Sequence, residues 1–202
     1  INLTKEEKGK YNNNGLIKIF RNKKSIKYIL IINVINQISS KINYHENILL
    51  NSSEIILKIN KTGMNNILYD GWLNKYYPCP SSIYLNDTIQ NLTDCTKINI
   101  DTPGSIVKLV WNNPLNSIQC LFCSCSNIAE IKFLNFDTSS LTYMGGLFMG
   151  CTSLTSVDVS NLNTKNVNSI SEMFYECNSI KFINLSNFDA SSVTEMQRMF
   201  KN

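Results

Sequence analysis

The sequence predicts an α/β repeat fold, in which a solenoid with a parallel β ladder and short helices follows a small β-rich region. The main observation is a fixed 26-residue period in the second half of the chain, which is typical of solenoids. Within each period the apolar residues first show the spacing of a strand and then that of a helix. The period is clearest in an aromatic and a cysteine column: Phe122, Phe148, Phe174 and Phe200, with Cys125, Cys151 and Cys177.

Each repeat divides into two halves by the spacing of its apolar residues. The segment 154–159, LTSVDV, has apolar residues at alternate positions near its end, as in a strand with one buried face. The segment 167–174, VNSISEMF, has them three to four residues apart, as in a short helix. Between the two lie Asn and Thr residues of the kinds that form turns and helix N-caps. One coil therefore reads as a strand, a corner, a short helix and a return.

Successive coils must stack, because a single repeat cannot bury its own apolar residues. We place the solenoid at residues 105–202 and expect the aromatic rings and inert thiols to form interior columns. Residues 97–122 match the columns only in part and are expected to form a degenerate first coil. We expect the solenoid to continue past Asn202, because an uncapped last coil exposes its apolar edge. The full repeats are 122–147, 148–173 and 174–199.

Residues 45–104 are predicted to form the β-rich region, with three to five short strands. Its Ile-rich segments are separated by turn-forming residues, as expected of antiparallel strands. The clearest of these segments are 54–60, 82–85 and 97–100.

Residues 1–44 are predicted to be a basic tail with a possible signal or anchor segment. The first 27 residues hold eight Lys and Arg against two Glu. No aromatic pattern or groove-reading helix accompanies these charges, so we predict a solvated or targeting tail and no nucleic-acid partner. The apolar run at 26–38 falls short of the roughly 20 residues of a membrane span. It has the layout of a signal peptide, although a buried strand or amphipathic segment explains it equally well.

Catalytic motifs are missing from the sequence. His45 is the only histidine, and no nucleophile elbow, phosphate loop or zinc-protease motif occurs. Cys120 and Cys123 have a spacing that suits zinc or a redox pair, but a second pair at comparable spacing is absent. We therefore predict that the protein is not an enzyme and binds neither a cofactor nor a metal.

The cysteines and sequons bear on secretion. If the chain is secreted, Cys79 and Cys95 are the best candidates for a disulfide, and Cys120 and Cys123 can bond at the start of the solenoid. Six Asn-x-Ser/Thr sequons fit a glycosylated protein, although chance produces many in an Asn-rich chain. Two are at Asn2 and Asn184, and the candidate glycosylation sites are Asn51, Asn60, Asn86 and Asn91.

A candidate binding face follows from the strand alternation. The side chains beside the inward strand residues face outward and differ from coil to coil, as on a recognition surface, although drift on a solvated face predicts the same. Phe182 favours contact with a partner, whereas a glycan at Asn184 would cover the face. The face comprises Glu130, Lys132, Leu134, Ser156, Asp158, Ser160, Phe182, Asn184 and Ser186.

The segments 154–159 and 173–177 (MFYEC) resemble the BspA-like leucine-rich repeats, in their 26-residue surface-protein variant. The resemblance covers residues 123–202 well and 97–122 weakly. It implies a leucine-rich-repeat-type solenoid in a secreted or cell-surface protein that binds a protein or glycan on a host, matrix or neighbouring cell. The alternative is a cytoplasmic scaffold that docks a protein partner. The inward Asn of the larger class is replaced by Phe136, Leu162 and Phe188.

Overall fold

The computed structural model describes Gln37 and residues 52–71, 78–115, 117–136 and 138–201. The chain divides into two compact units, 1–46 and 47–202. Of the first unit only Gln37 is described, as an exposed helical residue. The predicted basic tail and signal segment therefore lie outside the described residues.

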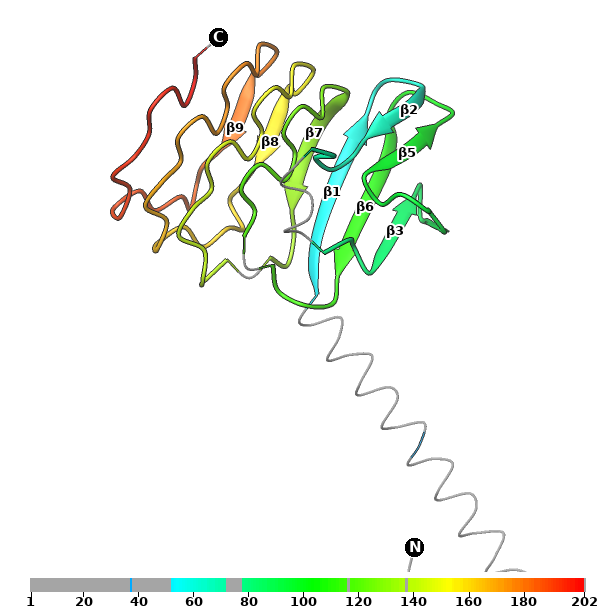
Figure 1. Ribbon diagram of the computed structural model, residues 1–202, viewed down its shortest axis with the longest axis horizontal. Helices are drawn as coiled ribbons and strands as arrows, with labels where there is room; N and C mark the ends of the chain where they lie inside the picture. The colour runs from blue at the N-terminus through cyan, green and yellow to red at the C-terminus, as the bar shows by residue number, and fades with distance from the viewer. Residues whose placement is uncertain (1–36, 38–51, 72–77, 116, 137, 202) are drawn as a thin grey trace, which may run out of the picture. The chain divides into compact units, whose positions relative to one another are not determined.

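The described residues of the second unit form nine strands. Seven make one sheet in the order β4-β3-β6-β1-β7-β8-β9, and β2 and β5 pair in a second sheet (Figure 1). The strands are β1 (Ser53–Ile59), β2 (Gly63–Asn66), β3 (Ser82–Leu85), β4 (Thr88–Gln90), β5 (Lys97–Ile100), β6 (Ser105–Trp111), β7 (Ile128–Phe133), β8 (Ser156–Asp158) and β9 (Phe182–Asn184).

The strands β7, β8 and β9 are parallel and one repeat apart in the sequence. Ile131 lies opposite Val157, and Val157 opposite Ile183. The strand β1 is antiparallel to both of its neighbours, β6 and β7. Its inward residues Ile55 and Leu57 are fully buried, in keeping with its alternating sequence. One sheet therefore runs through both the β-rich region and the repeats.

Each repeat returns from its strand through a series of turns. Apart from Gln37, none of the described residues lies in a helix. The prediction of an α/β, leucine-rich-repeat-type solenoid with short helices is therefore wrong. The described unit consists of strands and turns built on a seven-stranded sheet.

Left-handed residues explain why the helix-like spacing does not give a helix. Glu172 and Glu176 both have φ of 58°, and such residues cannot continue a right-handed helix. Each of these two positions recurs at 26-residue intervals with positive φ, giving the columns Cys120, Gly146, Glu172 and Arg198, and Ser124, Gly150 and Glu176.

Backbone hydrogen bonds in this segment alternate between two kinds of partner. The Phe174 amide donates to the Met199 carbonyl of the next coil (2.9 Å), whereas the Met173 amide donates to Ile170 three residues back (3.2 Å). A chain of turns thus supplies the three-residue spacing, and bonds between coils replace the four-residue ladder of a helix.

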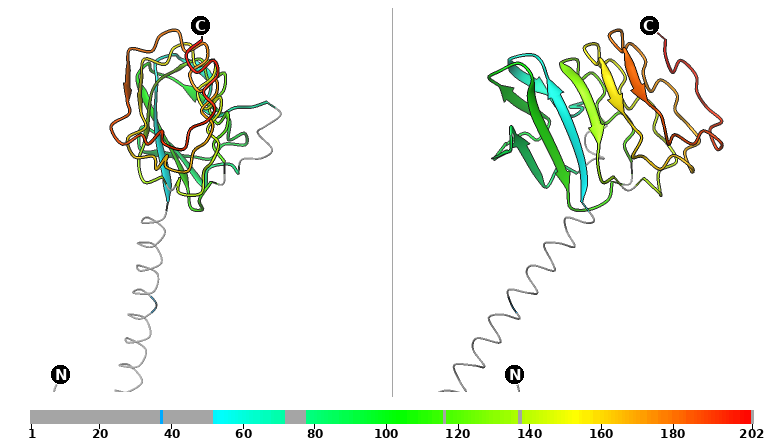
Figure 2. Two further views of the ribbon diagram at one scale, coloured as in Figure 1. Left: turned by 90° about the vertical axis from the view of Figure 1, so that its left-hand side faces the viewer. Right: turned by 180° about the vertical axis from the view of Figure 1, so that it is seen from behind.

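The backbones of successive coils overlie one another when viewed along the stack (Figure 2). Side chains from these coils fill the interior. Phe122, Phe148 and Phe174 are buried, with ring centroids 6.1 and 5.2 Å apart along the column. Phe200 continues the column at 5.4 Å but is 57% exposed. The 26-residue period therefore corresponds to direct stacking of like residues.

Candidate binding face

The outer face of the seven-stranded sheet carries the predicted binding residues. In β7 the inward residues Ile131 and Phe133 are buried, whereas Glu130 and Lys132 between and beside them are exposed. The same alternation leaves Ser156 and Asp158 half-buried on the outer side of Val157 in β8. The period of two in a strand places these side chains on one surface.

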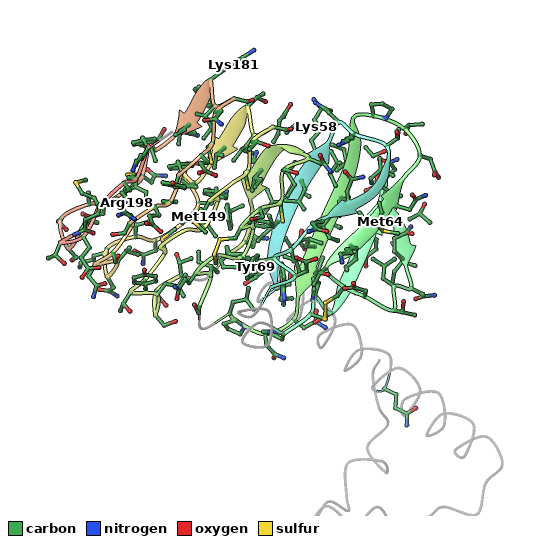
Figure 3. All side chains as sticks on the ribbon, turned by 45° about the horizontal axis from the view of Figure 1, so that its top comes forward. Lys58, Met64, Tyr69, Met149, Lys181 and Arg198 are labelled. Carbon is green, nitrogen blue, oxygen red and sulfur yellow. A yellow bond between two sulfur atoms is a disulfide. The ribbon has the colours of Figure 1, made fainter. Side chains whose placement is uncertain are left out.

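One row of this face crosses four strands in register. Lys58 lies opposite Glu130, which is followed by Ser156 and then Phe182. The Lys58 ammonium bonds the Glu130 carboxylate at 2.7 Å, and both side chains remain more than one third exposed (Figure 3). Phe182 is 60% exposed and ends the row with an uncovered ring.

A second row runs parallel to the first across six strands, and its members lie opposite one another in the sheet. The row is Tyr84, Lys108, Ile56, Lys132, Asp158 and Asn184. The Lys108 ammonium lies 4.6 Å from the ring centre of Tyr84, which is a cation–π contact between neighbouring strands.

Asp158 and Asn184 are fixed by hydrogen bonds within this row. Burial raises the pKa of the Asp158 carboxyl, but the Ser160 hydroxyl and amide, the Lys132 charge and the Asn184 amide outweigh it. The net effect lowers this pKa below its ordinary value, so Asp158 is ionised at neutral pH. The Ser160 hydroxyl donates to Asp158 at 2.6 Å, and the Asn184 side-chain amide at 3.1 Å.

The remaining predicted residues lie at the next corner of the coil. Leu134 is half-buried, and its amide donates to the Glu54 carbonyl of β1 at 2.9 Å. Ser186 is exposed, and its hydroxyl donates to the Asn184 side chain at 2.6 Å. These residues extend the face toward the corner without adding a cavity.

Sequence reasoning missed the part of the face that β1, β6 and β3 supply. Lys58, Ile56, Lys108 and Tyr84 extend the surface beyond the repeats. The alternation in the segments that contain them could have shown that they lie on one side of a strand. It could not have shown that β1 inserts between β6 and β7, because that pairing joins segments far apart in the sequence.

Two disulfides link the cysteine pairs that the sequence singled out. One joins Cys79 to Cys95, and the other joins Cys120 to Cys123. The second is buried, and Tyr69 and Met149 pack against it. Both stabilise the region in which the β-rich segments meet the first turns of the stack.

The cysteine column consists of three free, buried thiols. The Cys177 thiol donates to the Phe148 carbonyl at 3.0 Å, and Cys151 contacts Phe122 in the same way. Burial raises the pKa of Cys177 to about 11, and it also raises those of Cys125 and Cys151 well above the ordinary thiol value. These thiols are therefore protonated at neutral pH and unsuited to nucleophilic chemistry.

The sequons differ in how their side chains are used. Asn60 and Asn91 are exposed, and Asn51 lies outside the described residues. Asn86 forms a tight turn with Asp87, and its side-chain oxygen accepts the Ile106 amide at 2.9 Å. A glycan at Asn86 would have to project from this bonded side chain.

Comparison with known protein families finds a match in the second half of the chain. Residues 111–202 are similar to the family described as "Mycoplasma protein of unknown function, DUF285". The match begins at the end of β6, covers the stacked coils and spans less than half of the chain. This family is distinct from the BspA-like repeats, so the resemblance to the latter remains a hypothesis. No curated protein and no solved structure matches the chain.

The described residues contain no group of three or more His, Cys, Asp or Glu side chains placed to hold a metal ion. None of their helical residues belongs to a segment long and apolar enough to cross a membrane.

Proposed function

We propose that this protein is a non-catalytic binding module, secreted or exposed at the cell surface, which contacts a protein or glycan through the outer face of its sheet. The observation that carries the proposal is the contrast between the two sides of β7, β8 and β9. The interior positions Ile131, Val157 and Ile183 keep one chemistry from coil to coil. The outward positions in register change from Glu130 to Ser156 to Phe182.

The chemistry of the face suits recognition of a macromolecule. It combines an exposed ring at Phe182, a surface ion pair at Lys58 and Glu130, and fixed polar groups at Asp158 and Asn184. Aromatic anchors surrounded by oriented polar groups are typical of binding surfaces. The two disulfides and the resemblance to surface-protein repeats support the extracellular setting.

Binding by matched variants tests this proposal. The purified chain is applied to a panel of immobilised matrix glycoproteins and to intact epithelial cells, and binding is measured by surface plasmon resonance and flow cytometry. We expect Lys132→Glu combined with Phe182→Ala to weaken binding at least tenfold. Glu172→Ala, which removes a half-buried carboxylate paired with Arg198 on the turn side, should alter it less than twofold. Absence of binding by the unmodified chain, or equal binding by both variants, would contradict the proposal.

The location of the endogenous protein supplies the second test. A secreted or surface protein should be found outside the cytosol with Cys79 and Cys95 resistant to alkylation until a reductant is added. Endogenous protein in the cytosol with all seven thiols reduced would remove the basis for an extracellular role and favour the intracellular scaffold.

A further inference from the structure

One end of the seven-stranded sheet is the strand β4 (Thr88–Gln90), which pairs with β3. Both strands lie in the β-rich region before the repeats, so this edge is the same however many coils follow Asn202. Among the described residues, no strand pairs with the side of β4 that faces away from β3. An edge of this kind can accept a strand from another molecule.

The backbone groups of Ile89 point toward this free side. The Asn86 amide donates to the Ile106 carbonyl of β6 at 2.9 Å, so Asn86 faces β6. Backbone groups of successive strand residues point to opposite sides, and Leu85 therefore faces β4. Leu85 lies opposite Thr88 in the hairpin. Thr88 thus faces β3, and the amide and carbonyl of Ile89 face away from it.

The Ile89 side chain is uncovered at the same place. It is 57% exposed and lies opposite Tyr84, so it belongs to the outer face of the sheet. Natural sheet edges are commonly protected by proline, a bulge or charge. The residues of β4, Thr88–Gln90, contain no proline and no charged residue, and they pair with β3 in an unbroken register. The edge therefore offers a donor, an acceptor and an apolar side chain on one residue.

We propose that two copies of this chain pair through β4, antiparallel and around a twofold axis at Ile89. The Ile89 amide of each copy then donates to the Ile89 carbonyl of the other, which is the closely spaced hydrogen-bonded pair of an antiparallel ladder. Thr88 lies opposite Gln90 of the second copy, and the two Ile89 side chains meet on the outer face. A twofold interface requires a surface that is complementary to itself, and Ile89 meets this requirement.

A second copy suits this short edge better than a foreign strand. In the antiparallel register Asp87 lies opposite Asn91 of the second copy, so no like charges face each other across the axis. A longer foreign segment would extend beyond the three residues of β4, and its additional backbone groups would find no partners there. Symmetry gives each group of the edge its complement without such an excess.

This pairing places two outer faces on the same side of one continuous sheet, because the twofold axis is perpendicular to the sheet. The contact is small, so we expect a reversible dimer. On a surface with many ligands, a dimer whose outer faces bind as proposed above engages two ligands at once and binds more tightly than a monomer. That consequence rests on the proposed function, whereas the pairing itself does not.

Sedimentation equilibrium of the full chain, produced without glycans at Asn86 and Asn91, tests the pairing. We expect a monomer–dimer equilibrium with a dissociation constant below about 1 mM. Ile89→Pro removes the amide that the second copy needs, and proline is tolerated at an edge position whose amide faces solvent. Ile89→Pro and Ile89→Lys should each weaken the association at least tenfold and remain folded by circular dichroism. The matched control Met64→Lys, at a residue of β2 that is 66% exposed, should change it less than twofold.

Cross-linking locates the twofold axis. The Cα atoms of a hydrogen-bonded antiparallel pair lie about 5.5 Å apart, within the range of a disulfide. On mild oxidation, Ile89→Cys should therefore form a covalent dimer at least ten times faster than Met64→Cys. A parent chain that stays monomeric to about 1 mM, equal cross-linking by the two cysteine variants, or equal weakening by Met64→Lys would overturn the proposal.

The dimer and the outer-face function can fail independently. Lys132→Glu combined with Phe182→Ala changes the face but not the edge, and should leave the sedimentation of the chain unchanged. Loss of the dimer in this variant would show that the copies meet through the outer face, and would also overturn the assignment to β4.

Discussion

Phe148 and Phe174 are separated by 26 residues in the sequence, yet their rings stack with centroids 5.2 Å apart and planes 19° from parallel. Both rings are buried, and the amide of Phe148 donates to the carbonyl that precedes Phe174. Side-chain stacking and backbone bonding therefore fix the register between coils at the same place. A substitution in this column should therefore lower the stability of the whole stack of coils.

The first prediction concerns this aromatic column. Phe148→Ala should lower the free energy of unfolding by about 3–5 kcal/mol, because it removes buried surface and leaves a cavity between two coils. Phe200→Ala is the matched control, since that ring is 57% exposed, and should cost about 1 kcal/mol. Urea unfolding followed by circular dichroism measures both. Equal losses would show that the column does not stabilise the fold.

The second prediction concerns the left-handed columns. Gly150 has φ of 73°, and an added Cβ would lie 3.4 Å from the Ser124 Cα. Gly150→Ala should therefore destabilise the protein by about 1–2 kcal/mol. Glu176 holds the same position in the next coil with φ of 58°, so Glu176→Gly should stabilise it by up to about 1 kcal/mol.

Thermal denaturation of both variants tests the sign of these effects. Asn178→Gly is the control, because Asn178 is exposed and has no positive φ. It should be neutral or destabilising, since glycine adds freedom to the unfolded chain without relieving strain. A Glu176→Gly variant that behaves like Asn178→Gly would contradict the explanation given for the missing helix.

The repeat and its interior columns could be predicted from the sequence, because a constant period fixes which residues overlie one another. The conformation between strands could not. Three-residue spacing at Val167, Ile170 and Met173 is common to a helix and to a chain of turns, and the choice depends on φ at Glu172. Glutamate has no marked preference for left-handed φ, so the residue type at this position does not indicate a left-handed conformation. Only Gly146 and Gly150, at the equivalent positions of the previous coil, are of a residue type that favours positive φ.

The candidate face was predictable only where the period applied. Alternation around Val157 placed Asp158 on the outer side, and the structure has it there. The neighbouring Lys58 and Lys108 come from β1 and β6, and their positions depend on antiparallel pairing across 50 or so residues, for which local patterns hold no information. The order of the strands in the sheet therefore determines which residues belong to the face.

The third prediction concerns the buried thiols. Burial raises the pKa of Cys177 to about 11 from the model-compound value of 9.0, and it also raises those of Cys125 and Cys151. When the pKa of a group is higher in the folded than in the unfolded state, its contribution to stability is complete at pH values below the pKa of the unfolded state. This contribution is lost as the pH rises toward the pKa of the folded state. The folded protein should therefore lose stability between about pH 9 and 11, as thiols ionise in the unfolded chain.

Replacing the three thiols isolates their part of this loss. The melting temperature is measured at pH 7.5 and 10.5 for the parent and for Cys125→Ala combined with Cys151→Ala and Cys177→Ala. The triple variant should be less stable at both values but should lose less between them. An identical loss in both proteins would show that lysine or tyrosine titration, and not the cysteine column, governs the alkaline limit.

The fourth prediction concerns a threonine that joins two coils. The Thr164 hydroxyl donates to the Asp189 carbonyl at 3.0 Å and accepts the Asp189 amide at 2.7 Å, and the residue is 1% exposed. Thr138 makes the same pair of bonds to Asn163 one coil earlier. These hydroxyls connect neighbouring coils in place of the helix caps expected from the sequence.

Thr164→Val keeps the shape of the side chain but removes both bonds, and leaves the amide and carbonyl of Asp189 without partners. It should lower the free energy of unfolding by about 1 kcal/mol, the usual net contribution of an intramolecular hydrogen bond, because Asp189 is exposed and water can reach it. Thr194→Val is the control, because Thr194 is exposed and its hydroxyl donates at a longer 3.3 Å. That change should cost less than about 0.5 kcal/mol. Amide hydrogen exchange at Asp189 should accelerate only in the Thr164 variant, and unchanged protection there would disprove the role assigned to the hydroxyl.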